Sequence, residues 1–146
     1  MKNQSIEKQG YSELFQGVVK QIQQGRVKAA SEANKLIGEM YFNIGRIITE
    51  KQEKYGWGKS IVEKLAVDLN EIFEGREGYS PQNLWYMRQF YLKYKDNRAL
   101  LDLAFIIPWG QNILIISKIK DTKEREYYLK ATVNNAWSRS ILLNQI

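Results

Sequence analysis

The sequence contains no cysteine and no histidine, and these two absences exclude much of the chemistry found at active sites. Without cysteine the chain has no disulfides and no thiolate metal ligands, and without histidine it lacks the commonest general base and metal ligand. No apolar run approaches the roughly 20 residues of a membrane-spanning helix. The polar start of the chain does not resemble a signal peptide. We therefore expect a cytoplasmic protein that has no membrane contact, no metal and no cofactor.

Proline is also scarce, with two among 146 residues, so long helices can form without interruption. The 44% of hydrophobic residues are enough for the core of one domain. Lysine and arginine exceed aspartate and glutamate by 22 to 16, which gives a net charge of +6. Residues 81–130 hold 9 basic and 5 acidic side chains and so carry +4 of this charge. Either this segment binds a polyanion, or it is simply a solvated basic surface.

Apolar residues spaced three and four positions apart predict helices along most of the chain. We expect helices over residues 11–24, 26–53, 60–74, 81–95, 97–107, 121–135 and from residue 138 onward. The N-caps would be Ser12, Ser60 with Glu63, Ser80, Asp121 with Glu124, and Ser138. Residues 26–53 would form a long spine helix, which Gly25 separates from the preceding one. The sequence therefore predicts an all-α fold.

Two features of this predicted fold leave alternatives open. Gly38 and Gly45 lie inside the spine helix, and we attribute them to the close crossing of another helix rather than to a ligand. Residues 112–119 are rich in β-branched side chains, so they form either a helix or a strand paired with residues 105–107. We favour the helix. The alternative is a small β-hairpin wing near residues 103–117.

The predicted helices 60–74 and 81–95, with a turn at residues 75–79 between them, have the order and lengths of a helix-turn-helix. Spacing the residues of the second helix 100° apart places one set of side chains toward the core. This inner set is Asn83, Met87, Phe90, Tyr91 and Tyr94. The outer set is Gln82, Trp85, Tyr86, Gln89 and Lys93, with Arg88 on the flank.

Side chains of the outer set are typical of nucleic-acid contacts, because glutamine can pair with adenine, and aromatic rings such as Trp85 can stack on bases. We expect base or sugar contacts from Gln82, Tyr86 and Gln89. Phosphate contacts would come from Arg88, Lys93, Lys95, Arg98, Lys118, Lys120 and Lys123. The alternative is that Trp85 and Tyr86 are buried, within the domain or by a protein partner. The chain would then be a protein-interaction or dimerisation module that uses the spine helix and Trp85.

A nuclease of the PD-(D/E)XK type needs an acidic residue on one strand and an acidic-X-Lys triplet on the next. The only such triplet of interest is Asp121-Thr122-Lys123, which lies at a predicted helix start, where capping explains the aspartate. No glycine-rich phosphate loop is present either. We therefore expect no catalytic residues in this chain. A nuclease activity of the chain itself is the third and weakest hypothesis.

Several blocks of sequence resemble the N-terminal domain of YhcG-like proteins. Residues 78–91, GYSPQNLWYMRQFY, are similar to its signature G-[FY]-S-x-x-N-L-x-x-M-R-x-F, and residues 108–112, PWGQN, to its PW-x-H-N element. Residues 41–48 with 56–58, 125–128 and 137–146 resemble its long helix and closing helices. The resemblance covers residues 11–146 and implies a DNA-binding module that precedes a PD-(D/E)XK nuclease domain. On this view residues 1–146 are the single N-terminal domain, and the implied partners are DNA, a nuclease domain or subunit, and a second copy of the chain.

The chain departs from this family pattern at Gln111, where the family usually has histidine. Glutamine keeps a hydrogen-bond donor and an acceptor but does not titrate, so an acid-base role at this position is not expected. A structural hydrogen bond remains the expected role of Gln111. We assign the neighbouring Trp109, Asn112, Trp137 and Arg139 to interhelical packing and capping.

Overall fold

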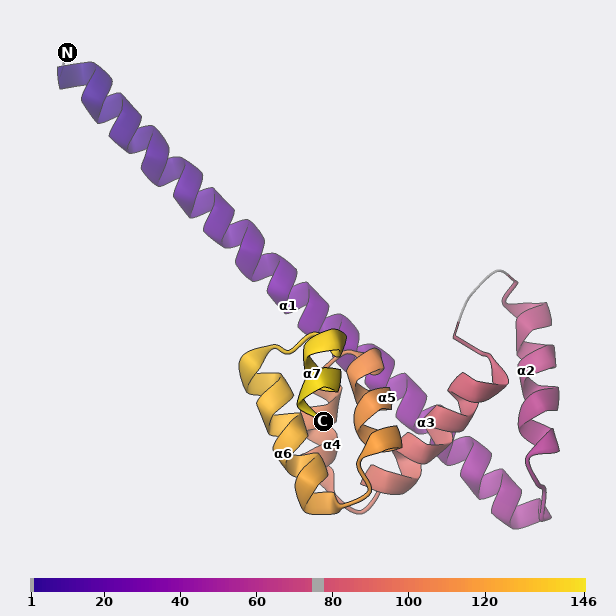
Figure 1. The fold of residues 1–146 in the computed structure, drawn as a ribbon. Coiled ribbons are helices and arrows are strands. Elements are labelled where there is room, and N and C mark those ends of the chain that lie inside the picture. The colour runs from indigo at the N-terminus through magenta and orange to yellow at the C-terminus, as the bar shows by residue number, and fades with distance from the viewer. Residues whose placement is uncertain (1, 75–77) are drawn as a thin grey trace. The chain divides into compact units, whose positions relative to one another are not determined.

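The computed structural model describes residues 2–74 and 78–146. The chain divides into two compact units, Met1–Ala33 and Asn34–Ile146, and each is described by itself. All regular secondary structure among the described residues is helical, which confirms the all-α prediction (Figure 1). Within this part of the chain, no helix combines the length and apolar character needed to cross a membrane.

The first helix, α1, is longer than predicted and spans Lys2–Tyr55. Ser12 therefore lies inside the helix and is not its N-cap, and Gly25 does not separate two helices. A glycine inside a helix costs about 1 kcal/mol relative to alanine, whereas starting a new helix requires a costly nucleus. The residues on both sides of Gly25 are good helix formers, so the helix continues through it. The first unit consists of this N-terminal part of α1, and the second unit begins with its C-terminal part.

The second unit contains six further helices among its described residues. They are α2 (Ser60–Ile72), α3 (Pro81–Tyr94), α4 (Arg98–Ile106), α5 (Trp109–Lys118), α6 (Thr122–Asn135) and α7 (Arg139–Gln145). The β-hairpin wing near residues 103–117 is therefore wrong, and the helical alternative is confirmed. The β-branched residues of α5 are mainly buried, and their packing in the core outweighs their preference for strands. Residues 75–77 of the predicted turn lie outside the described part of the chain.

Local capping sets most of the helix starts. The side chains of Ser80, Asp121 and Ser138 each accept a hydrogen bond from the backbone N–H three residues later, as predicted. The capping box at Ser60 is wrong, because Lys59 is the N-cap of α2 and Ser60 is already helical. Glu63 still lies in the first turn of α2, where a negative charge interacts favourably with the helix dipole.

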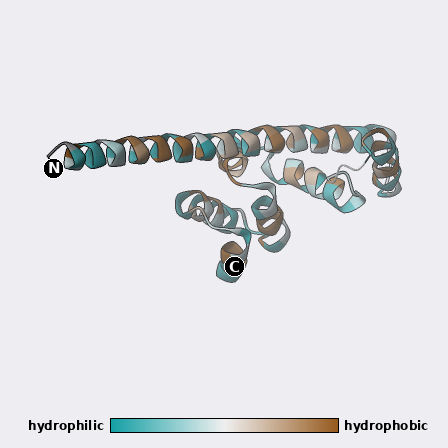
Figure 2. Ribbon diagram, turned by 90° about the horizontal axis from the view of Figure 1, so that it is seen from above, coloured by the Kyte–Doolittle hydropathy of each residue, from teal (hydrophilic) through white to brown (hydrophobic). Residues whose placement is uncertain are grey.

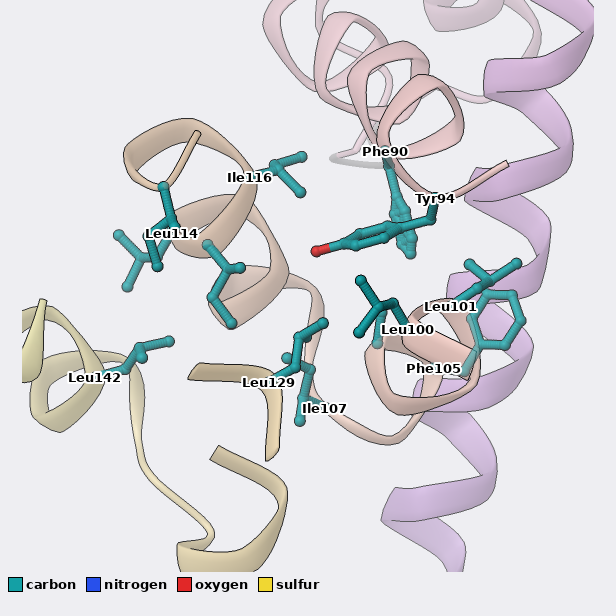
Figure 3. Close-up of a cluster of buried hydrophobic side chains, with 13 residues drawn as sticks. Phe90, Tyr94, Leu100, Leu101, Phe105, Ile107, Leu114, Ile116, Leu129 and Leu142 are labelled. Atoms are coloured by element: carbon teal, nitrogen blue, oxygen red, sulfur yellow. The ribbon is translucent and has the colours of Figure 1, made fainter. Parts of the chain in front are cut away.

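Two clusters of buried side chains hold the second unit together. The larger cluster contains side chains from each of the helices α3, α4, α5, α6 and α7. Its members include Phe90, Tyr94, Leu100, Leu129 and Leu142 (Figure 3). The smaller cluster packs α1 against α2 and α3 through Ile48, Val62, Ala66, Leu84 and Met87. The N-terminal half of α3 contributes Leu84 and Met87 to the smaller cluster, and its C-terminal half contributes Phe90 and Tyr94 to the larger one, so one side of α3 is buried along the whole helix.

The two glycines of α1 in the second unit allow other helices to approach closely, as predicted. A Cβ atom added to Gly45 would overlap the backbone carbonyl of Met87 in α3. A Cβ atom on Gly38 would lie 2.8 Å from the ring of Phe105 in α4. Gly45 therefore permits a helix contact that any larger residue would prevent, whereas a side chain at Gly38 would displace the ring of Phe105.

Candidate nucleic-acid interface

The N-terminus of α3 is fixed by its own capping residues and by Asn83. Ser80 Oγ accepts from the backbone N–H of Asn83 at 3.1 Å, and Pro81 occupies the first helical position, where its missing N–H is not needed. The Asn83 side chain donates to the carbonyl of Gly78 and accepts from Trp109 Nε1 at 2.7 Å. Asn83 and Trp109 thus connect α3 to the preceding loop and to α5. Their role is structural.

The predicted outer face of α3 is only partly accessible. Gln82 is exposed, and its Nε2 donates to the Tyr86 hydroxyl at 3.2 Å. Trp85, Gln89 and Lys93 are half-buried. Tyr86 is also half-buried and packs against the larger core cluster. The predicted outward orientation is therefore right for Gln82 and only partly right for the other four.

Trp85, in the N-terminal half of α3, has two cations close to its ring. Lys59 Nζ is 5.1 Å and Arg88 Cζ is 4.8 Å from the centroid of its ring, which are distances typical of cation–π contacts. Arg88 is also bound to α1, because its Nε donates to Gln52 Oε1 at 2.6 Å. Arg88 therefore has a structural role that the sequence did not indicate. Lys59, which the sequence analysis did not select, adds a second positive charge beside the indole.

The C-terminal half of α3 faces a second group of cations, which we call the basic cluster: Lys93, Lys120 and Arg125. Burial lowers the pKa of Lys93, and the nearby charges of Arg125 and Lys120 lower it further. These three side chains come from α3, from the loop before α6, and from α6 itself. Lys93 is therefore repelled by both of the other cations, and an anion bound beside Lys93 would offset that repulsion.

Arg125 is the buried member of the basic cluster and was missed by the sequence analysis. Its guanidinium donates to the carbonyls of Ile119 and Lys120, at 3.3 and 2.7 Å, and to Thr122 Oγ1 at 3.1 Å. Among the described residues it forms no ion pair with a carboxylate. Arg125 lies four residues before Leu129, a core residue of α6, and both therefore lie on the inner face of that helix. This spacing is the signal in the sequence that could have identified Arg125.

The remaining predicted phosphate contacts differ in whether a carboxylate pairs with the cation. Lys95, Lys118 and Lys123 are exposed, and none of them forms an ion pair with a described residue. Arg98 is different, since its Nε lies 2.9 Å from the carboxylate of Asp102. Its charge is largely balanced at this short range. Arg98 is therefore the weakest of the predicted phosphate contacts.

Gln111 and Asn112 have the structural roles that were predicted. Gln111 Nε2 donates to the carbonyl of Trp137 at 3.2 Å and so connects α5 to the turn between α6 and α7. Asn112 is fully buried, and its Nδ2 donates to the carbonyl of Ala104 at 2.9 Å near the end of α4. Both side chains satisfy backbone groups at the ends of helices.

The only acidic-X-Lys triplet considered for catalysis is accounted for by local structure. Asp121 Oδ2 accepts from the backbone N–H of Glu124 at 3.1 Å and caps α6. In the part of the chain that the structure describes, no three acidic side chains gather closely enough to hold a metal ion. The site can therefore be described as basic and aromatic groups on a helical scaffold.

Comparison with known proteins supports the resemblance found in the sequence. The family described as the DUF1016 N-terminal domain matches residues 17–146. The chain is also 24% identical, over 170 aligned residues, to the Escherichia coli K12 protein named "Putative nuclease YhcG". The alignment covers 94% of this chain but only 44% of that protein, so the chain spans less than half of the relative's length. No solved structure matches the chain.

Proposed function

The chain belongs to the family of DUF1016 N-terminal domains, and from this premise we propose that it is a non-catalytic module that binds nucleic acid, with duplex DNA as the partner. The name of its relative refers to a nuclease, and more than half of that relative lies outside the alignment. We assign cleavage to that other part and substrate binding to the part that this chain represents.

The observation that carries this proposal is the basic cluster. Lys93 and Lys120 are cations without an ion pair among the described residues, and the charge of the buried Arg125 acts on Lys93 as well. The phosphates of nucleic acid are closely spaced anions that such a group would bind, with release of counterions from the nucleic acid. Lys95, Lys118 and Lys123 would extend the contact along the backbone.

Base or sugar contacts would come from the side of α3 that carries Gln82, Tyr86 and Gln89. Helical spacing places these residues on the same side as Lys93, so one stretch of nucleic acid could contact them together with the basic cluster. Gln82 is the most accessible of the three. The segment between α2 and α3 runs from residue 73 to residue 80, which is longer than the three or four residues of a typical helix-turn-helix turn. We therefore expect the basic cluster to contribute more to binding than insertion of α3 into a groove of the duplex.

A binding titration with a mixed-sequence DNA duplex at two salt concentrations tests this function. We expect binding that weakens steeply with salt, and a double variant Lys93→Gln/Lys120→Gln that binds at least several-fold more weakly. The slope of log K against log salt should fall by about 1 to 2, since each phosphate contact contributes about 0.9.

The matched control is Lys64→Gln/Lys130→Gln, which removes the same net charge. Lys64 and Lys130 are each ion-paired on their own helix, with Asp68 and Glu126. Equal weakening by both double variants would mean that only net charge matters, and would remove the basic cluster as the site. The absence of any binding at low salt would overturn the function itself. The same titration with RNA decides between the two nucleic acids.

A further inference from the structure

The N-terminal unit of the chain exposes a row of apolar side chains along one side of α1. Tyr11, Phe15, Val18 and Ile22 are spaced by four, three and four residues and are 66, 57, 49 and 49% exposed. We call these four residues the apolar seam. Hydrophobic positions recur along this part of α1 in Figure 2. A seam that repeats every three and four residues is the pattern of a helix that pairs with another helix in a coiled coil.

This part of α1 needs support beyond its own sequence. It contains Gly10, Gly17 and Gly25, and each costs about 1 kcal/mol relative to alanine inside a helix. A Cβ atom added to any of these three glycines would meet no atom within 4 Å. Unlike Gly45, they therefore serve no helix contact within the chain. A helix with three such residues would gain most of its stability from packing of its apolar side.

A membrane surface fits this helix less well than a second helix does. Helices that lie on membranes carry many lysines and arginines on their polar side and a broad apolar side. The side of α1 opposite to the apolar seam is instead rich in glutamine, including Gln9, Gln16 and Gln23. The apolar side also includes Leu14 and Val19, which flank the seam and would pack beside it against a second helix.

We propose that the apolar seam binds the same seam of a second copy of this chain, as an antiparallel two-stranded coiled coil. In this register Phe15 of one copy lies opposite Val18 of the other, and Tyr11 lies opposite Ile22. Lys8, which continues the seam toward the N-terminus, then faces Gly25 of the other copy. The absence of a side chain on Gly25 leaves room for the stem of the lysine.

Charge complementarity selects the antiparallel arrangement. In the antiparallel register Glu7 of each copy lies beside Lys28 of the other, which forms two pairs of opposite charge. A parallel register would place Lys8 of one copy against Lys8 of the other at a seam position, where like charges repel. It would also place Gly25 against Gly25, where neither copy contributes a side chain to the contact. The occupant that fits this surface best is therefore the same helix in the opposite direction.

Light scattering of the full chain over two decades of protein concentration tests the dimer. We expect a dimer that dissociates on dilution. Val18→Glu should weaken the association at least tenfold, whereas Val27→Glu should leave it unchanged. Val27 is 71% exposed on the opposite side of the same helix, so this control places the same charge outside the seam. A chain that is monomeric at every concentration, or a dimer that Val18→Glu does not weaken, would overturn the proposal.

The orientation can be tested by cross-linking, because the native chain has no cysteine. A mixture of Tyr11→Cys and Ile22→Cys chains should form the mixed disulfide in preference to either symmetric one. Preferential formation of symmetric disulfides would indicate a parallel coil and would overturn the antiparallel register. Glu7→Lys should weaken the dimer, and Lys28→Glu in the same chain should restore it. Failure of this rescue would remove the proposed charge pairing. None of these outcomes depends on nucleic-acid binding.

Discussion

At the residue scale, the larger core contains a hydroxyl group that has no hydrogen-bond partner. Tyr94 is fully buried between α3 and its neighbours, and its hydroxyl points into the cluster (Figure 3). The hydroxyl meets no partner among the described residues. Burial raises the pKa of Tyr94 far above its ordinary value, while Arg125 lowers it to a smaller extent. The hydroxyl therefore stays protonated, and it pays a desolvation cost that no hydrogen bond offsets.

We predict that Tyr94→Phe leaves the free energy of unfolding unchanged or raises it by up to about 1 kcal/mol, because a buried group without a partner is removed. The matched control is Tyr128→Phe. The Tyr128 hydroxyl donates to the carbonyl of Gln145 at 3.1 Å, so its loss should cost about 0.5–1.5 kcal/mol. Urea denaturation of both variants measures the difference. A loss of more than about 2 kcal/mol for Tyr94→Phe would show that its hydroxyl has a partner.

At the element scale, glycines in the same helix should respond in opposite ways to the same substitution. Gly45→Ala should destabilise the protein by about 2 kcal/mol or more, because its Cβ would overlap the Met87 carbonyl and force α1 and α3 apart. Gly17→Ala introduces no such overlap and should increase helix content, with a gain of up to about 1 kcal/mol. Thermal unfolding and far-UV circular dichroism measure the two effects. Equal behaviour of the two variants would contradict the packing of α1 on α3.

The same scale shows what the sequence could and could not predict. The bounds of α3 and α6 followed from Ser80, Asp121 and their neighbours, because a cap is determined within three or four residues. Gly25 misled the prediction, since a helix tolerates one glycine when its neighbours favour the helix. The sequence left residues 112–119 open between helix and strand, because β-branched residues favour strands. The structure forms a helix there, since α5 buries these residues against other helices that are distant in sequence.

The candidate site was less predictable than the helix starts, because its contacts join residues that are distant in sequence. Helical spacing correctly placed Met87, Phe90 and Tyr94 inside and Gln82 outside. Spacing within one helix does not show what the other helices cover. The bond from Arg88 to Gln52 joins residues 36 positions apart, and Lys59 reaches Trp85 from α2's N-cap. The spacing of Arg125 from Leu129 indicated that it faces inward, but two of its partners are backbone carbonyls, which the sequence pattern does not reveal.

At the scale of the whole molecule, the two proposals assign dimerisation to the first unit and nucleic-acid binding to the second. The second unit contains every member of both core clusters and all of the predicted nucleic-acid contacts. The first unit contains the apolar seam. A dimer would bring two basic clusters to one nucleic acid, and two linked sites bind more tightly than one when both can engage the same molecule. Dimerisation would therefore raise affinity for long duplexes more than for short ones.

Deletion of residues 1–33 tests this division of tasks. We predict that residues 34–146 keep the unfolding free energy of the full chain to within about 1 kcal/mol, because the deletion removes no member of either core cluster. The shortened chain should be monomeric by light scattering. It should bind a duplex just long enough for one copy with the affinity of the full chain, and a duplex long enough for two copies more weakly than the full chain does. A large loss of stability would show that the first unit supports the core, and an equal loss on both duplexes would place nucleic-acid contacts in residues 1–33.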